Sequence, residues 1–371
     1  MDLPAPQPEA PLSPPPNLRT GPIANLFLYI LLLTGLWTIR QIVFVHPQQS
    51  TPQLSSSTDT SLPLVPYITN ASVDFVALFC VTLFMAKLED RPVGVFGLGG
   101  THSPSRFFYG TAWGFIAMSL LIATLHALHL LIFDARLLHG PTILNRALAQ
   151  LFLFLLVGLF EEYFFRGYLL ATLARALVSI GSLLSPEHAR TLAFWLASLI
   201  TSALFLFAHT HNAGENWLGL FQVFLAGILF VVALWRTGSL WWGIGFHMAW
   251  DWSQSFLYGV PDSGGLMQGR LFATHALGNP LYSGGTVGPE GSVLCIPIFL
   301  LVIAVLLFTH PSPQPPLEIY PPLDTSPTLD TIPTLDTIPT LDTSPTLDTI
   351  PTLDTINTNS PLVISTEAHS A

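Results

Sequence analysis

The sequence predicts an all-α, polytopic membrane protein with about eight transmembrane helices. Hydrophobic residues make up 50% of the 371 residues and charged residues only 9%, whereas about 25% of the residues of an ordinary soluble domain are charged. The mean hydropathy is +0.57, and the apolar residues gather in long runs. Because a membrane-spanning helix needs about 20 mostly apolar residues, each long run is predicted to be a span.

The runs follow one another along the chain and are separated by short loops. The first run follows a Pro-rich lead without a basic start or a cleavage site of small residues, so it is predicted to be a retained span rather than a signal peptide. Only Arg236-Thr237-Gly238 separates the sixth run from the seventh, which predicts a helical hairpin. The predicted spans cover residues 23–45, 67–88, 107–133, 147–171, 191–211, 217–236, 238–257 and 292–309.

The distribution of basic residues predicts that both termini are cytoplasmic, because positive charges tend to stay on that side. The loops that would then be cytoplasmic hold Arg19, Lys87, Arg91, Arg106, Arg175, Arg190 and Arg236, and the outer loops hold Arg136, Arg146 and Arg270. The chain is therefore predicted to be a multi-pass integral membrane protein, of the inner membrane if the source is bacterial.

Composition divides the chain into three parts: a Pro-rich disordered lead (1–20), a membrane domain (21–310) and a low-complexity tail (311–371). The tail repeats a six-residue unit that contains proline, which disfavours helix interiors and central strands, so an extended acidic tail is expected. No basic patch or motif indicates nucleic-acid binding. Cys80 and Cys295 lie in apolar runs and do not indicate a disulfide framework.

Within the fourth predicted span, two adjacent carboxylates and an arginine stand among apolar residues. Glu162 and Arg166 are four residues apart and share a helical face, so they can form an ion pair. Glu161 points about 140° away from Arg166 by helical geometry and is left unpaired. Charged residues inside a membrane usually serve function, and a partly desolvated carboxylate suits a general base. The alternative is an ion-paired cluster that fixes helix packing.

Two further spans carry histidines. His209 lies near the end of the fifth span, where an interfacial or hydrogen-bonded role is the alternative to a catalytic one. His247 and Asp251, four residues apart in the seventh span, share one face, so Asp251 could orient the imidazole, both could bind a metal, or the pair could lock two helices. These span boundaries place Glu161, His209 and His247 at different depths, so a shared site requires tilted or re-entrant helices.

The three motifs together resemble the CAAX-protease and bacteriocin-processing (CPBP) family of intramembrane proteases, also called the ABI family, which includes the Ras-converting-enzyme type of prenyl endopeptidase. The chain carries Glu-Glu-x-x-x-Arg at 161–166, Phe-x-x-x-His at 205–209 and His-x-x-x-Asp at 247–251, in that order on three separate spans. The resemblance covers about 70–260.

The resemblance implies a role for each motif residue. Glu161 would activate a water, His209 would help to hold and deprotonate it, and Glu162 and Arg166 would support the site. His247 and Asp251 would stabilise the oxyanion, although an ionised Asp251 could not donate a hydrogen bond and fits better as a partner of His247 or of a metal.

The cofactor is left open between Zn²⁺ and none. Glutamate and histidine are ligands that Zn²⁺ accepts, but the helix motif His-Glu-x-x-His, typical of zinc proteases, is missing.

The prediction from the sequence is therefore an intramembrane endopeptidase that hydrolyses a peptide bond of a membrane-associated protein or peptide with a glutamate-activated water, with CAAX-type C-terminal processing as one form of this activity. The alternatives are a non-proteolytic immunity or scaffold protein of the same family, and an ion-coupled transporter that uses the buried carboxylates.

Overall fold

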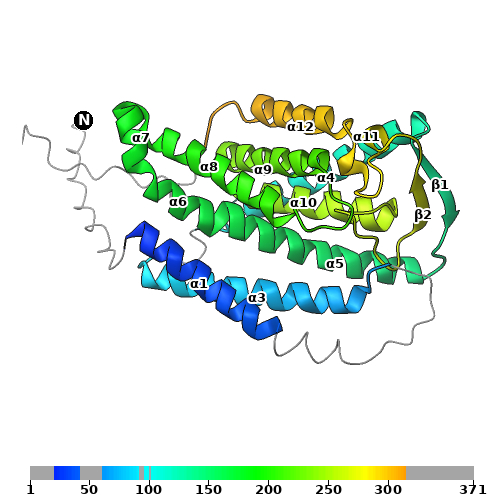
Figure 1. The fold of residues 1–371 in the computed structure, drawn as a ribbon, viewed down its shortest axis with the longest axis horizontal. Helices are drawn as coiled ribbons and strands as arrows, with labels where there is room; N and C mark the ends of the chain where they lie inside the picture. The colour runs from blue at the N-terminus through cyan, green and yellow to red at the C-terminus, as the bar shows by residue number, and fades with distance from the viewer. Residues whose placement is uncertain (1–20, 42–60, 92–95, 100–101, 315–371) are drawn as a thin grey trace, which may run out of the picture. The chain divides into compact units, whose positions relative to one another are not determined.

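The computed structural model describes residues 21–41, 61–91, 96–99 and 102–314. The predicted Pro-rich lead and the predicted repeat tail from residue 315 onward lie outside these residues. Within them, helices run side by side along one common direction (Figure 1).

Fifteen helical segments and two strands make up the described chain. In order they are α1 (Pro22–Arg40), α3 (Leu64–Leu88), α4 (Ser103–Ala127), β1 (Leu131–Arg136), α5 (Thr142–Glu162), η2 (Tyr163–Leu169), α6 (Leu170–Ala176), α7 (Val178–Leu184), η3 (Pro186–His188), α8 (Ala189–Ala208), α9 (Trp217–Thr237), α10 (Trp241–Trp252), η4 (Ser253–Leu257), β2 (Phe272–Ala276), α11 (Pro280–Ser283), η5 (Pro289–Gly291) and α12 (Cys295–Thr309).

The helices confirm a polytopic membrane protein, and they refine the predicted number of spans. In the described residues, six helices are long and apolar enough to cross a membrane, namely α1, α3, α4, the continuous run from α5 to α6, α8 with η3, and α9. The seventh and eighth predicted spans are helical but shorter, since α10 with its π-helical continuation η4 has 17 residues (12 + 5) and α12 has 15. The predicted count of eight is therefore approximate, and α10 depends on its neighbours for cover.

Two short strands interrupt the otherwise helical fold. The third predicted span, 107–133, ends at Ala127, and His129 adopts a positive φ of 58°. The chain then continues as β1, which pairs antiparallel with β2 and has an irregularity between Phe133 and Ala135. This two-stranded sheet lies at the end of the bundle where α5 begins (Figure 1).

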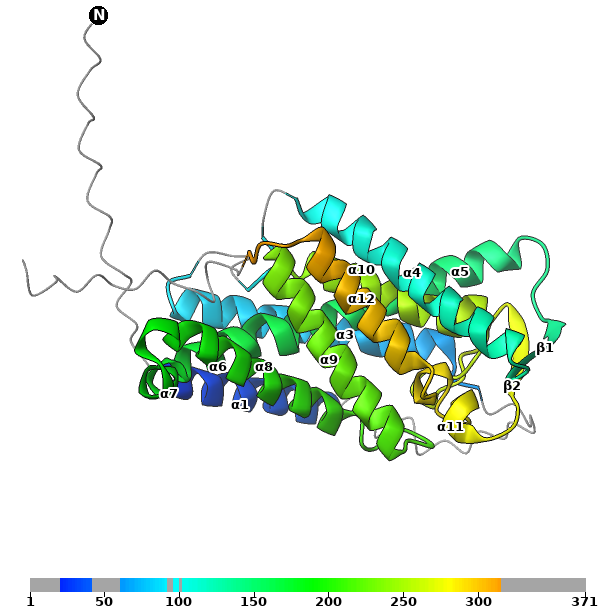
Figure 2. The ribbon, with the colours of Figure 1, turned by 90° about the horizontal axis from the view of Figure 1, so that it is seen from above.

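A close helix contact positions α10. A Cβ atom at Gly110 would lie 2.0 Å from the carbonyl oxygen of Trp242, and one at Gly114 would lie 2.3 Å from that of Phe246. On the other side, a Cβ atom at Gly245 would lie 2.2 Å from the carbonyl oxygen of Phe107. Glycine at these positions lets the two backbones touch. α10 also packs on α5, while α12 covers α9 and α4 (Figure 2).

Candidate active site

Glu162 and Arg166 form a fully buried ion pair. The Arg166 Nη1 atom donates to Glu162 Oε1 at 2.9 Å, and their side chains are 0% and 1% exposed. The guanidinium also lies over the ring of Phe205, at 4.2 Å from its centroid. An Arg side chain buried in this way needs both a counter-ion and a packing surface, and the two contacts supply them. The pairing expected from the spacing of these two residues is present.

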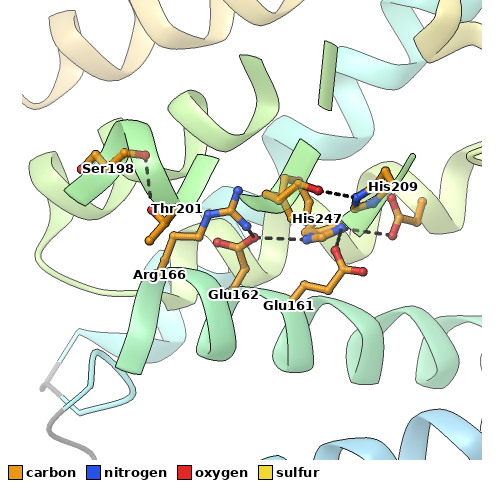
Figure 3. Close-up of polar contacts among 9 residues, drawn as sticks. Glu161, Glu162, Arg166, Ser198, Thr201, His209 and His247 are labelled. Atoms are coloured by element: carbon orange, nitrogen blue, oxygen red, sulfur yellow. Dashed lines mark hydrogen bonds and ion pairs between the residues drawn. The ribbon is translucent and has the colours of Figure 1, made fainter. Parts of the chain in front are cut away.

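His247 lies between the two adjacent glutamates (Figure 3). Its Nδ1 atom is 3.3 Å from Glu162 Oε1, and its Nε2 atom is 3.6 Å from Glu161 Oε2 and 3.5 Å from Asp251 Oδ2. Because Glu162 is ion-paired and can only accept a hydrogen bond, the proton of this contact belongs to Nδ1. The Nε2 atom therefore faces Glu161 and Asp251, and Glu162 rather than Asp251 orients the ring.

Glu161 is placed differently from its neighbour. Its side chain is 22% exposed, against 1% for Glu162, and it lines a cavity. No hydrogen bond or ion pair joins it to Arg166 in the described part of the chain. This contrast agrees with the prediction from helical geometry that Glu162 pairs with Arg166 and Glu161 does not.

His209 follows the last residue of α8 and forms its C-cap. Its Nδ1 atom lies 2.8 Å from the carbonyl oxygen of Phe205, and since a carbonyl only accepts, Nδ1 carries the proton. The ring also meets the Phe205 ring edge-to-face, with the centroids 4.6 Å apart. The Nε2 atom takes no part in this hydrogen bond.

One cavity of about 490 Å³ unites four of the predicted site residues. Glu161, His209, His247 and Asp251 all line it, whereas Glu162 and Arg166 lie behind its wall. The cavity thus brings together residues whose predicted span boundaries put them at different depths, and α8 packs beside η2 and α6. Figure 3 shows Glu161, His209 and His247 gathered in this region.

Sequence reasoning missed two carboxylates in the same cavity, Asp262 and Glu290. Asp262 lies in the loop after η4 and Glu290 in the one-turn helix η5, and each keeps part of its surface accessible. Ser255 donates to Asp262 at 3.2 Å, and the backbone N–H of Ser263 donates to Glu290. Burial and then repulsion by Glu290 raise the pKa of Asp262 well above its ordinary value, and burial raises the pKa of Glu290. Their only sequence signal is an acid in a Pro- and Gly-rich loop of a charge-poor chain.

The residues do not fit a metal site in this structure. In residues 21–41, 61–91, 96–99 and 102–314, no three His, Cys, Asp or Glu side chains are grouped so that they could hold a metal ion. Glu161, His209, His247 and Asp251 share a cavity without forming such a group.

The fold and the site define a multi-pass integral membrane protein with a carboxylate–imidazole cluster in a cavity between its helices. Residues 143–253 match the family model described as Type II CAAX prenyl endopeptidase Rce1-like. The matched segment holds all three motifs, and it confirms the predicted relationship to the CPBP family of CAAX proteases. It supports an intramembrane protease of the CAAX type in general. No curated protein and no solved structure matches the chain.

Proposed function

We propose that the chain is an endopeptidase in which Glu161 activates a water for attack on a peptide bond. The observation that carries the proposal is the placement of Glu161, His209 and His247 around one cavity, with His247 Nε2 3.6 Å from Glu161. An unpaired carboxylate next to imidazoles is a common arrangement for general acid–base catalysis.

The chemical steps follow from these contacts. Glu161 takes a proton from the water, and the resulting hydroxide attacks the substrate carbonyl carbon. His209 accepts a hydrogen bond from the water through Nε2, while its Nδ1–H is held by the Phe205 carbonyl. His247 Nε2, which faces Glu161 and Asp251, is the donor to the oxyanion in this proposal. Glu161 then gives its proton to the leaving nitrogen as the C–N bond breaks, and the products are a carboxylate and an amine.

The substrate in this proposal is a membrane-associated protein or peptide. Since the matched family model is described as a prenyl endopeptidase, lipidated C-terminal peptides are the first class to test. The cavity is lined largely by apolar and aromatic side chains in addition to its polar groups, which suits a substrate that approaches from the bilayer.

The test is Glu161→Gln, which keeps the size of the side chain and removes the base. Membranes with the wild-type protein and with the variant are compared for released peptides by mass spectrometry. General acid–base groups typically contribute about 10²- to 10⁴-fold, so cleavage should fall at least about 100-fold while thermal unfolding in micelles stays unchanged. Glu187→Gln, an exposed carboxylate on η3, should behave as wild type. Full cleavage by Glu161→Gln would refute the mechanism, and ion-coupled uptake without proteolysis would favour a transporter.

A further inference from the structure

Two loops, rather than long helices, form part of the wall of the catalytic cavity. The loop after η4 contributes Asp262, and the loop before α12 contributes Glu290 from its one-turn helix η5. The loops are tied together, since the Gly264 N–H donates to the Val287 carbonyl at 2.8 Å and Ser263 donates to Glu290. The two carboxylates are therefore held in place by a hydrogen-bonded framework.

A third acceptor joins them from α9. Gln222 is 1% exposed and lines the same cavity. Its Nε2 atom donates to the Ser292 carbonyl at 2.8 Å, and this bond fixes the orientation of the amide because a carbonyl cannot donate. Its Oε1 atom has no hydrogen-bond partner in the described structure. A buried acceptor without a donor costs free energy, so a ligand that donates a hydrogen bond to Gln222 Oε1 would remove this cost.

The charge of the cavity also favours a ligand that is a cation. Four carboxylates line it, from Glu161, Asp251, Asp262 and Glu290, while none of its described lining residues is a Lys or Arg. Burial and then repulsion by Glu290 raise the pKa of Asp262, while burial raises the pKa of Glu290. A bound cation would relieve the repulsion.

We propose that Asp262, Glu290 and Gln222 form a subsite for the ammonium or guanidinium group of a basic residue in the substrate. Lys and Arg side chains bring only hydrogen-bond donors together with a positive charge, which complements the acceptor oxygens of Asp262, Glu290 and Gln222. An organic cation fits better than a metal ion, because the described His, Cys, Asp and Glu side chains form no metal-binding group. The proposal rests on the proposed peptidase function and specifies which peptides the cavity selects.

The first experiment measures cleavage of paired peptides by the full-length protein in liposomes. Each pair carries Arg or its neutral isostere citrulline near the scissile bond. Charge-assisted hydrogen bonds are strong, and the wild-type protein should cleave the Arg peptide with a kcat/KM at least about tenfold higher. In the Asp262→Asn, Glu290→Gln double variant this ratio should fall to about one. Equal cleavage of both peptides by the wild type, or an unchanged ratio in the double variant, overturns the proposal.

Matched variants separate the subsite from general effects of charge. Asp134→Asn removes an exposed carboxylate on β1 that is paired with His275 and lies outside the cavity, and it should keep the wild-type ratio. Glu290→Gln alone retains an oxygen for the Ser263 N–H and should lower the ratio partway. A fall of the ratio in Asp134→Asn equal to that in the double variant would contradict a local subsite.

A binding measurement does not depend on proteolysis. Agmatine, a small guanidinium compound, should raise the melting temperature of the wild-type protein in micelles and should not raise that of the double variant. If the wild-type protein shows no peptidase activity on any peptide but shows this agmatine shift, the proposed function is refuted while the cation subsite is supported. A stabilising shift with CaCl₂ but none with agmatine would assign the three oxygens to a metal ion and overturn the proposal.

Discussion

Among single residues, Arg166 is linked to His247 through one shared carboxylate, that of Glu162. Glu162 Oε1 accepts from Arg166 at 2.9 Å and lies 3.3 Å from His247 Nδ1, so one oxygen serves both neighbours. With its counter-ion in place, Glu162 remains a pure acceptor and keeps the proton of His247 on Nδ1. Arg166 thus positions the catalytic imidazole through Glu162.

Arg166→Met should therefore affect both stability and catalysis. The change leaves a buried carboxylate without a counter-ion, and breaking a buried pair in this way typically costs about 3–5 kcal/mol. The melting temperature in micelles should fall clearly, and kcat should fall at least about tenfold, because the His247 ring loses its fixed partner.

Two variants serve as controls for this prediction. Arg136→Met, on the exposed end of β1, should leave both quantities unchanged. Adding Glu162→Gln to Arg166→Met should recover much of the stability but not the activity, since the unpaired charge is removed while the acceptor for His247 stays weakened. An Arg166→Met protein as stable and active as Arg136→Met would contradict the role assigned to the pair.

Contacts between residues four apart could be predicted from the sequence, while contacts across the fold could not. Helical spacing placed Glu162 beside Arg166 and His247 beside Asp251, and both pairs are present at 2.9 and 3.5 Å. The contact of His247 with Glu162 joins residues 85 apart and depends on how α10 packs on α5. Asp262 lies in a loop, where no periodicity links its position to the helices.

Among the elements, the contact of α4 with α10 determines where His247 lies. Gly114 touches the carbonyl oxygen of Phe246, the residue before His247. Any side chain at position 114 would push α10 away from α4, because the neighbouring atom is backbone and cannot rotate aside. The small residues of α4 are thus part of the construction of the site.

Gly114→Ala should lower the melting temperature and reduce kcat, although alanine is the better helix former by about 1 kcal/mol. Overpacking of this kind typically costs about 1–3 kcal/mol. Gly35→Ala in α1, where an added Cβ meets nothing within 4 Å, is the matched control and should be neutral or slightly stabilising. Equal melting temperatures and activities for the two variants would show that α4 and α10 can separate without consequence.

The two cavity loops predict a pH dependence of stability. The pKa values of Asp262 and Glu290 are raised in the folded protein, by burial first, so the folded state binds protons more tightly than the unfolded chain. The stability that they contribute is present below the ordinary carboxyl pKa and is lost as the pH rises through their raised values. Asp262 also faces Asp251 and Glu161, and Glu290 faces Glu215 and His209.

Melting temperatures measured between about pH 4.5 and pH 7.5 test this dependence, since ordinary carboxyl groups titrate near the lower limit. The wild-type protein should lose more stability on going to neutral pH than the Asp262→Asn, Glu290→Gln variant does. The comparison between the two proteins cancels the titration of histidines that do not face these carboxylates, whereas His209, which faces Glu290, contributes to the difference. A larger loss in the variant would give the wrong sign and refute the assignment.

Helix positions could largely be predicted from the apolar runs, but irregular segments could not. The predicted span 217–236 corresponds to α9, Trp217–Thr237, and the predicted span 67–88 corresponds to α3, Leu64–Leu88. The pairing of β1 with β2 joins segments that are far apart in the sequence. The π-helical turns η2 and η4 share no pattern that hydropathy could detect, since η2 is largely aromatic around Arg166 and η4 begins with Ser253, Gln254 and Ser255.

For the whole molecule, the charges of the loops predict which end of the bundle faces the cytoplasm. The connections at the α7 end carry more Lys and Arg than those at the β1 end, which include Arg136, Arg146 and Arg270. By the positive-inside rule the α7 end is cytoplasmic. The loops that carry Asp262 and Glu290 then lie toward the opposite face.

Cysteine labelling in intact cells tests this orientation. In a protein whose Cys80 and Cys295 are replaced by serine, His139→Cys should react with a membrane-impermeant maleimide from outside. Glu187→Cys should react only after permeabilisation. Both positions are exposed, and they lie near opposite ends of the run from α5 to α7. The reverse pattern would place the β1 end in the cytoplasm.

The shortness of α10 has a consequence for how the protein is made. Together with its π-helical continuation η4 it has 17 residues (12 + 5), which extend about 25 Å at 1.5 Å per residue, while the hydrocarbon layer is about 30 Å thick. We therefore expect this helix to insert stably only after the earlier helices that pack against it have assembled. Both glutamates are translated long before His247, so the nascent chain carries an inert half of its machinery. The peptidase activity that we propose would therefore appear late in biogenesis, and the growing polypeptide and the insertion apparatus would not be exposed to it earlier.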